Sequence, residues 1–192
     1  ATTLTIAPLQ ESHWPVVRAI FEEGLATGLA TFETQTPTWE AWDQAHRPDC
    51  RLVAQLEEQV VGWAALSPVS RRQVYHGVAE VSIYLAARVR GQGFGKTLLL
   101  TLIAESERAG IWTLQATIFP HNHASIAMHE ACGFRRVGVR ERIAQRHGVW
   151  LDTTLLERRS PVVGGSAPAS LSLSADKSNL TDIGSLDSGF FQ

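Results

Sequence analysis

Seven consecutive residues, Arg90 to Lys96, carry the clearest chemical signal in this 192-residue chain. Glycines stand at alternate positions, Gly91, Gly93 and Gly95, between a strand-like run and a helix-like run that begins at Lys96. Such a turn points several backbone N–H groups the same way, and at a helix N-terminus these donors bind phosphate oxygens. The loop therefore predicts a ligand that carries phosphate. The ordinary alternative is a glycine-rich turn without a ligand.

The spacing of the glycines distinguishes three kinds of phosphate loop. A nucleotide P-loop needs a glycine five residues before Gly95, where the chain has Arg90. The dinucleotide fingerprint, counted from Gly91, needs its third glycine at Lys96. Both patterns fail by one position, whereas Arg/Gln-x-x-Gly-x-Gly fits at Arg90, Gly93 and Gly95. This pattern resembles the pyrophosphate loop of the GNAT superfamily of acetyl-CoA-dependent N-acyltransferases.

A second segment, residues 122–134, resembles the helix that GNAT proteins commonly carry after this loop. The family form is Asn-x-x-[Ala/Ser]-x-x-x-[Tyr/His]-Glu-x-x-Gly-Phe. Alone, an asparagine N-cap and a C-terminal glycine are ordinary features of a helix. Together with the glycine loop they favour the family. The matching positions are Asn122, Ser125, His129, Glu130, Gly133 and Phe134.

Three more segments are similar to the phosphinothricin acetyltransferases and their methionine sulfoximine and methionine sulfone relatives. Residues 75–85 are similar to the family strand Tyr-x-x-Thr-Val-Glu-x-Ser-Val-Tyr-Val, and residues 30–34 and 146–152 fit two further motifs. One departure is that Val78-Ala79 replaces Thr-Val. Because the lost hydroxyl lines the acceptor side in the pattern, the acceptor can differ. The resemblance covers residues 1–158.

The resemblance implies an enzyme that transfers the acetyl group of acetyl-CoA to the α-amino group of a small amino acid or analogue. In the family, the backbone of one strand pairs with the pantetheine arm and supplies an oxyanion donor. The glycine loop holds the pyrophosphate, and the helix N-cap bonds the pantetheine or a water. The cofactor-binding positions are then Ile83, Tyr84, Leu85, Arg90, Gly91, Gln92, Gly93, Phe94, Gly95, Lys96, Asn122 and Ser125.

Two residues are candidates for proton transfer. An ammonium group cannot attack a thioester until it loses a proton to a positioned base. The resemblance makes Glu80 the candidate base, and period-two alternation places it on one strand face with Ser82 and Tyr84. His129 occupies the position where many GNAT enzymes have a tyrosine that protonates the departing thiolate. The alternatives are a surface ion pair for Glu80 and a packed helical histidine for His129.

Recognition of the acceptor's carboxylate would favour an arginine fork. Arg72, in the polar loop before the Glu80 strand, is the candidate. Phe32 and Tyr75 are predicted to form aromatic walls, with core packing as the alternative role. A histidine pair at residues 121 and 123 has no third ligand at a suitable spacing, so the sequence predicts no metal site.

The elements that must position these residues are readable from periodicity. Strands are expected at residues 4–6, 51–56, 60–66, 78–85, 114–119, 134–142 and 150–156. Helices are expected from about Pro15 to Leu25, from about residue 36 to 46, and at residues 96–108 and 122–131. The order β-α-α-β-β-β-α-β-α-β-β lacks regular alternation, which argues against a simple doubly wound sheet. It predicts an α/β (α+β) protein with the GNAT fold, a central mixed sheet flanked by helices.

Composition sets the remaining expectations. With 44% hydrophobic and 19% charged residues the chain is globular in composition, and a net charge of -2 argues against a nucleic-acid partner. No apolar run is long enough for a membrane span and no signal peptide is recognised, so a cytoplasmic enzyme is expected. Residues 1–160 form the predicted GNAT domain, and residues 161–192 a serine- and glycine-rich tail. The family is commonly dimeric, so a homodimer is expected.

Three other functions stay open at this level. One is acetylation of a protein N-terminus or lysine, which a shallow peptide groove beside Glu80 would favour. Another is a non-catalytic acetyl-CoA-binding module, against which the presence of both Glu80 and His129 argues. The third is a nucleotide-binding switch, which the glycine spacing disfavours.

Overall fold

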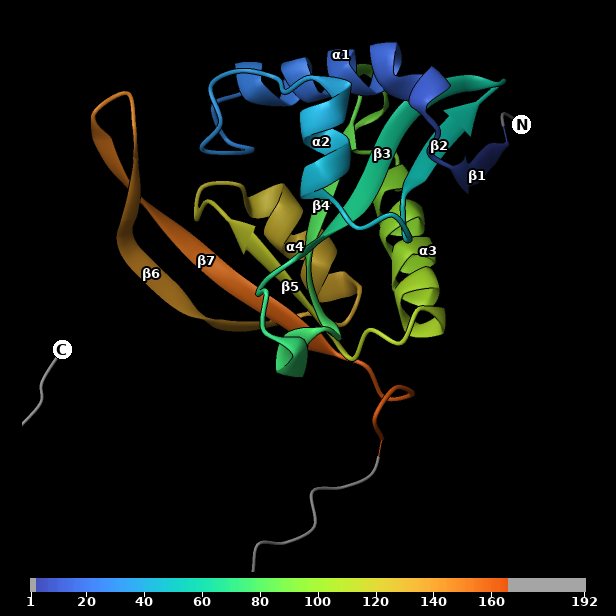
Figure 1. The fold of residues 1–192 in the computed structure, drawn as a ribbon. Helices are drawn as coiled ribbons and strands as arrows, with labels where there is room; N and C mark the ends of the chain where they lie inside the picture. The colour runs from blue at the N-terminus through green and yellow to red at the C-terminus, as the bar shows by residue number, and fades with distance from the viewer. Residues whose placement is uncertain (1–2, 166–192) are drawn as a thin grey trace, which may run out of the picture.

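The computed structural model describes residues 3–165 as a seven-stranded mixed sheet with helices on both faces (Figure 1). The order of the elements is the predicted one, and the α/β mixed-sheet fold class is confirmed. The predicted tail lies outside the described residues from residue 166 onward. The strands are β1 (Leu4–Pro8), β2 (Leu52–Leu56), β3 (Gln59–Pro68), β4 (Val78–Leu85), β5 (Thr113–Ile118), β6 (Arg135–Arg146) and β7 (Val149–Arg159). The helices are α1 (Trp14–Ala26), α2 (Trp39–Ala45), α3 (Phe94–Arg108) and α4 (His123–Ala131), with 3₁₀ turns at Glu11–His13, Gln73–Tyr75 and Ala87–Val89.

Strands β4 and β5 diverge at the centre of the sheet. Its strand order is β1-β2-β3-β4-β5-β7-β6, and the β4–β5 pair is the parallel one. These two strands are paired over three residue pairs only, and the pairing ends where Glu80 lies beside Gln115. Residues 81–85 of β4 stay paired with β3 on the other side. One edge of β4 is therefore open over its second half.

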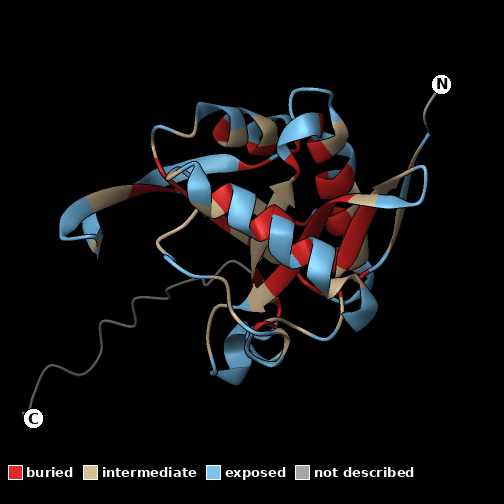
Figure 2. Ribbon diagram, turned by 90° about the horizontal axis from the view of Figure 1, so that it is seen from above, coloured by how far each residue is buried: buried red, intermediate tan, exposed pale blue. Residues whose placement is uncertain are grey.

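Successive side chains of β4 point to opposite faces of the sheet, so the strand contacts helices on both faces. Tyr84 meets Phe21 of α1 at a ring-centroid distance of 4.9 Å. The next residue, Leu85, packs against Gly95 of α3. The buried residues accordingly concentrate in the central strands and along the inner faces of the helices (Figure 2).

Two glycines of the phosphate loop have physical reasons to be glycine. Gly93 is the N-cap of α3 and has a φ of 84°, in the left-handed region that other residues rarely adopt. Gly95 lies in the first turn, where a Cβ would come within 2.7 Å of Met128 Sδ. Because Met128 lies in the second half of α4, this contact packs the start of α3 against α4. Helix α3 begins at Phe94, two residues before the predicted start.

The β6–β7 hairpin is longer than predicted and extends beyond the helices (Figure 1). Its turn is His147-Gly148, with positive φ at both positions, as two-residue hairpins prefer. At the end of β6, the guanidinium of Arg146 donates to the carbonyl oxygens of Thr31, at 2.9 Å, and Gly28, at 2.5 Å. The hairpin therefore holds the loop between α1 and α2 in place.

The hairpin also carries an exposed apolar cluster. Its members are between 45% and 59% exposed, which is unusual for valine, isoleucine and tryptophan side chains on neighbouring strands. The cluster consists of Val137, Val139, Ile143, Val149 and Trp150.

No helix among residues 3–165 is long and apolar enough to cross a bilayer.

Candidate active site

Two cavities adjoin along the open edge of β4. The first has a volume of about 320 Å³ and contains Glu80 and His129 in its lining. The second has a volume of about 470 Å³ and is lined by the glycine loop. We call them the acceptor cavity and the cofactor groove. Both volumes are in the range of small-molecule sites. The residues common to both linings are Ala30, Ile83, Tyr84, Asn122 and Ser125.

The cofactor groove brings together ten of the twelve predicted cofactor-binding residues. At Gly91 and Gly93 a Cβ would meet no atom within 4 Å, so both face open space. Arg90 is oriented by a bond from its Nε to the carbonyl oxygen of Leu85, at 3.1 Å. Gln92 and Phe94 lie outside the lining: the Gln92 amide donates to the Arg88 carbonyl at 3.1 Å, and Phe94 packs against the core. The lining members are Ile83, Tyr84, Leu85, Arg90, Gly91, Gly93, Gly95, Lys96, Asn122 and Ser125.

The open edge of β4 and the glycine loop fit an extended ligand that ends in a pyrophosphate. Backbone groups of residues 81–85 that point toward β5 have no strand partner, so they can pair with an amide-containing arm as an added strand. The helix N-terminus at Gly93 then lies where phosphate oxygens can be held. Acetyl-CoA has both features.

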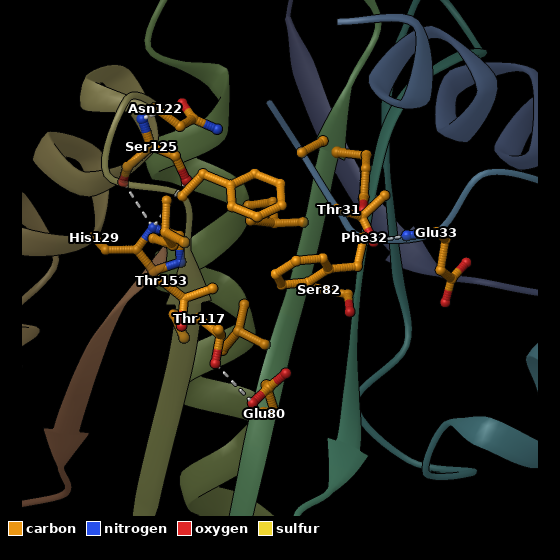
Figure 3. Close-up of a pocket in the computed structure, with 17 residues that line it drawn as sticks. Thr31, Phe32, Glu33, Glu80, Ser82, Thr117, Asn122, Ser125, His129 and Thr153 are labelled. Atoms are coloured by element: carbon orange, nitrogen blue, oxygen red, sulfur yellow. Dashed lines mark hydrogen bonds between the residues drawn. The ribbon is translucent and has the colours of Figure 1, made fainter. Parts of the chain in front are cut away.

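Glu80 lies at the point where β4 and β5 separate (Figure 3). Its Oε2 accepts a hydrogen bond from Gln115 Nε2 at 2.6 Å and another from Thr117 Oγ1 at 3.2 Å. Among residues 3–165 no group donates to Oε1. The Thr117 hydroxyl in turn accepts from Arg140 Nη2 at 3.3 Å. Glu80 is therefore half-buried and held through one oxygen, and it makes no direct ion pair with a described residue.

His129 is a buried neutral imidazole, only 2% exposed. Burial lowers its pKa, and a hydrogen bond to the Ser125 carbonyl opposes that shift. Since a carbonyl only accepts, the proton lies on Nδ1, which is 2.8 Å from the Ser125 oxygen. Nε2 then carries a lone pair, and no described residue bonds to it. In this tautomer His129 accepts a proton before it can donate one.

Hydrogen bonds and ring stacking hold the wall that the two cavities share. Asn122 accepts from the Ser125 N–H at 3.2 Å as the N-cap of α4 and donates to the Leu29 carbonyl at 3.3 Å. Tyr84 stacks on Trp63 at 4.8 Å between ring centroids. Burial raises the pKa of Tyr84 well above its ordinary value, so its phenol stays neutral.

The predicted substrate residues separate into two places. Phe32 lines the acceptor cavity and meets Phe119 edge to face at 4.8 Å. Arg72 and Tyr75 lie outside that lining, exposed at the 3₁₀ turn before β4, with the guanidinium of Arg72 5.6 Å from the ring centre of Tyr75. Glu33 lies at the rim of the cavity, where partial burial raises its pKa. The roles of Arg72 and Tyr75 stay predictions.

Sequence reasoning missed three residues of this site: Gln115, Thr117 and Thr153. Gln115 and Thr117 alternate with buried apolar residues on β5, and polar side chains inside a central strand are a detectable signal. Thr153 lines the acceptor cavity, is 1% exposed, and its hydroxyl has no partner among the described residues. No group of three or more His, Cys, Asp or Glu side chains in residues 3–165 could hold a metal ion.

Comparison with known proteins identifies the class. Residues 14–134 match the family model of the GNAT acetyltransferases, and the chain belongs to this family. It is 34% identical to phosphinothricin N-acetyltransferase of Alcaligenes faecalis over 165 residues, 80% of this chain and 81% of the relative. It is 32% identical to L-methionine sulfoximine/L-methionine sulfone acetyltransferase of Pseudomonas paraeruginosa over 150 residues, 74% and 87% of the two chains. The suspected family is thus confirmed, and the protein is an N-acetyltransferase.

Two solved structures are also similar. A phosphinothricin acetyltransferase of Sinorhizobium meliloti, in complex with acetyl-CoA, superimposes with a TM-score of 0.77 at 28% identity, covering 88% of this chain and 94% of the other. A ribosomal-protein-alanine N-acetyltransferase from Brucella melitensis superimposes with a TM-score of 0.74 at 30% identity, covering 81% and 99%. Both likenesses agree with the GNAT fold, and the second bears on the choice of acceptor.

Proposed function

We propose that this protein acetylates the α-amino group of a small amino acid or analogue by direct attack of the amine on acetyl-CoA. The observation that carries the proposal is the pair of adjoining cavities with one shared wall. The groove contains the glycine loop, and the acceptor cavity contains Glu80 and His129. Relatives that act on phosphinothricin and methionine sulfoximine support this class of acceptor.

The stoichiometry of the reaction explains why two proton carriers are useful. The acceptor nitrogen loses one proton to become a nucleophile and a second proton when the amide forms. The CoA sulfur gains one proton on leaving, and one proton passes to solvent. We assign the first proton to the free Oε1 of Glu80. We assign the second to Nε2 of His129, which then protonates the thiolate.

The lining of the acceptor cavity narrows the acceptor. It contains two carboxylates, Glu33 and Glu80, and no lysine or arginine. An ammonium group and a neutral side chain suit this lining better than a strongly anionic side chain. Methionine sulfone and methionine sulfoximine are therefore our preferred acceptors, ahead of phosphinothricin. The acceptor's carboxylate would extend toward Arg72, outside the lining.

Acetylation of a protein N-terminus is the second candidate, favoured by the likeness to the ribosomal-protein-alanine N-acetyltransferase. A peptide needs an open path away from the reacting nitrogen. Here Arg146 holds the loop of residues 28–31, whose Ala30 and Thr31 form part of the cavity wall. The held loop bounds one side of the cavity, which supports a small acceptor.

Two further properties belong to the proposal. We propose a homodimer in which a second copy covers exposed apolar side chains of the hairpin, because each of Val137, Val139, Ile143, Val149 and Trp150 would otherwise stay about half in water. We also propose a cytoplasmic location. The free, buried thiols of Cys50 and Cys132 are compatible with a reducing compartment.

The deciding experiment measures release of CoA thiol from acetyl-CoA against a panel of acceptors. The panel holds methionine sulfone, methionine sulfoximine, phosphinothricin and a peptide with an N-terminal alanine. Turnover of the peptide alone would replace the small-molecule proposal with the second candidate. Glu80→Gln should lower kcat/KM by roughly 10²–10⁴. Glu58→Gln, an exposed carboxylate outside both cavity linings, is the matched control and should change it little.

A further inference from the structure

The two carboxylate oxygens of Glu80 have different surroundings. Oε2 receives two hydrogen bonds, from Gln115 and Thr117, and the bond from Gln115 at 2.6 Å is short for a neutral amide donor. Oε1 receives none from the described residues. An oxygen with two donors is a poor proton acceptor, because a proton on it would displace a bond. The geometry therefore leaves Oε1 as the reactive oxygen.

Gln115 stands behind Glu80 rather than in the cavity. It pairs with Glu80 in the last register of the parallel ladder, and it is absent from the lining of the acceptor cavity. Thr117 lies two residues further on the same face of β5 and does reach the lining. Gln115 lines neither cavity, and its side-chain hydrogen bond to Glu80 is its direct link to the acceptor cavity.

We propose that Gln115 is the positioning residue of the catalytic base, assisted by Thr117. Its amide holds Oε2 and so directs Oε1 toward the acceptor nitrogen. Donors to a carboxylate stabilise its charged form over its protonated form, which gives a variant without the donor a measurable signature. During the reaction a proton passes from the acceptor's ammonium group to Oε1, giving a neutral amine and a protonated Glu80, while both bonds to Oε2 persist. This inference rests on the proposed function.

The other charged and titratable groups around Glu80 set the background for a pH experiment. Arg140 of β6 acts through the Thr117 hydroxyl, Glu33 lies at the cavity rim, and His129 of α4 lies in the same cavity. None of these three makes a hydrogen bond to Gln115, and Glu157 of β7, which lies beside Gln115 in the sheet, bonds to Arg135 instead. Replacing Gln115 therefore changes the bonding of Glu80 while these neighbours stay constant.

The test compares Gln115→Leu with the wild type in the pH dependence of kcat/KM. Leucine keeps the volume of the side chain and removes the donor. We expect the acidic limb of the kcat/KM profile to move to higher pH by about one unit, as for loss of a hydrogen bond to a charged acceptor. Thr117→Val should move it in the same direction by less. Thr113→Val, on the same face of β5 but outside both cavity linings and without a side-chain bond to Glu80, should leave it in place.

A merely structural role for Gln115 predicts a different result. The bond would then only join β4 to β5, so Gln115→Leu would lower Tm and leave the acidic limb where it is. That outcome would overturn the inference. If Gln115→Leu does not fold, Thr117→Val carries the same comparison, and an unshifted limb in that variant counts against the proposal.

A second readout separates failure of this inference from failure of the proposed function. The carboxyl carbon of Glu80 can be followed by ¹³C NMR in the free protein and assigned by its loss in Glu80→Gln. Its titration midpoint should rise in Gln115→Leu whether or not an acceptor is known. If no acceptor is turned over by the wild type but the midpoint rises, the function is wrong and the positioning is right. An unchanged midpoint refutes the positioning.

Discussion

Gly93 and Gly110 allow the phosphate loop to be tested with a matched control. Gly93 has a φ of 84° and Gly110 a φ of 80°, and at neither position would a Cβ meet an atom within 4 Å. Alanine at either site therefore encounters the same left-handed strain and no clash. That strain costs about 1–2 kcal/mol. In a domain of this size it corresponds to a decrease in Tm of roughly 2–8 °C.

The two variants should differ only in cofactor binding. Gly93 lines the cofactor groove at the N-terminus of α3, whereas Gly110 follows the C-terminus of the same helix and lines neither cavity. Relaxing the strain at Gly93 turns the N–H groups of the loop away from the phosphates. Losing one charge-assisted bond of about 1.5–3 kcal/mol weakens binding roughly 10- to 150-fold.

Calorimetric titration with acetyl-CoA and a thermal melt measure both quantities on the same samples. We expect Gly93→Ala and Gly110→Ala to lose similar stability, and Gly93→Ala alone to lose affinity. If Gly93→Ala binds acetyl-CoA as tightly as Gly110→Ala, the loop is not the pyrophosphate site. Tight binding of ATP by the wild type, without binding of acetyl-CoA, would also contradict the assignment.

Three further predictions concern other parts of the molecule. Thr153→Val removes a buried hydroxyl that has no described partner, so Tm should stay level or rise by roughly 2–4 °C. A clear decrease in Tm would instead reveal a hydrogen bond of this hydroxyl. The control is Thr154→Val, at the neighbouring position outside both cavity linings. Trp150→Lys places a charge among the exposed apolar side chains of the hairpin and should convert the proposed dimer to a monomer in sedimentation; a monomeric wild type would refute that proposal. Arg72→Ala should raise KM for the acceptor roughly 10- to 150-fold with a smaller change in kcat, and the same rise in Arg71→Ala would point to general surface charge instead.

Local signals predicted most of the fold. The N-cap of α4 at Asn122 and the glycine-rich start of α3 are determined by neighbours in sequence, so local patterns placed both helix starts within two residues. The lengths of β6 and β7 were underestimated. Those strands continue to a turn at His147-Gly148, past an irregular segment at Arg142 whose N–H donates to Asp152. A break in periodicity of this kind ends the strand predicted from the sequence, whereas the strand in the structure continues past it.

Long-range geometry could not be predicted in the same way. The separation of β4 from β5 depends on two strands that are distant in sequence, so neither strand alone shows where their pairing ends. Glu80 was identified through the family pattern, but its bond to Gln115 joins residues 35 positions apart. The placement of Arg72 outside the acceptor cavity likewise depends on the direction of a turn.

The open edge of β4 links the stability of the protein to its cofactor. Residues 81–85 form an interior strand that lacks a neighbour on one side, so its amides should exchange with solvent faster than those of β3 beside it. A ligand that pairs with this edge completes the hydrogen bonding of the sheet and stabilises only the native chain. At a concentration one hundred times its Kd, such a ligand adds about 2.7 kcal/mol to the free energy of unfolding. The supply of acetyl-CoA would then govern how long the enzyme survives proteolysis as well as how fast it turns over.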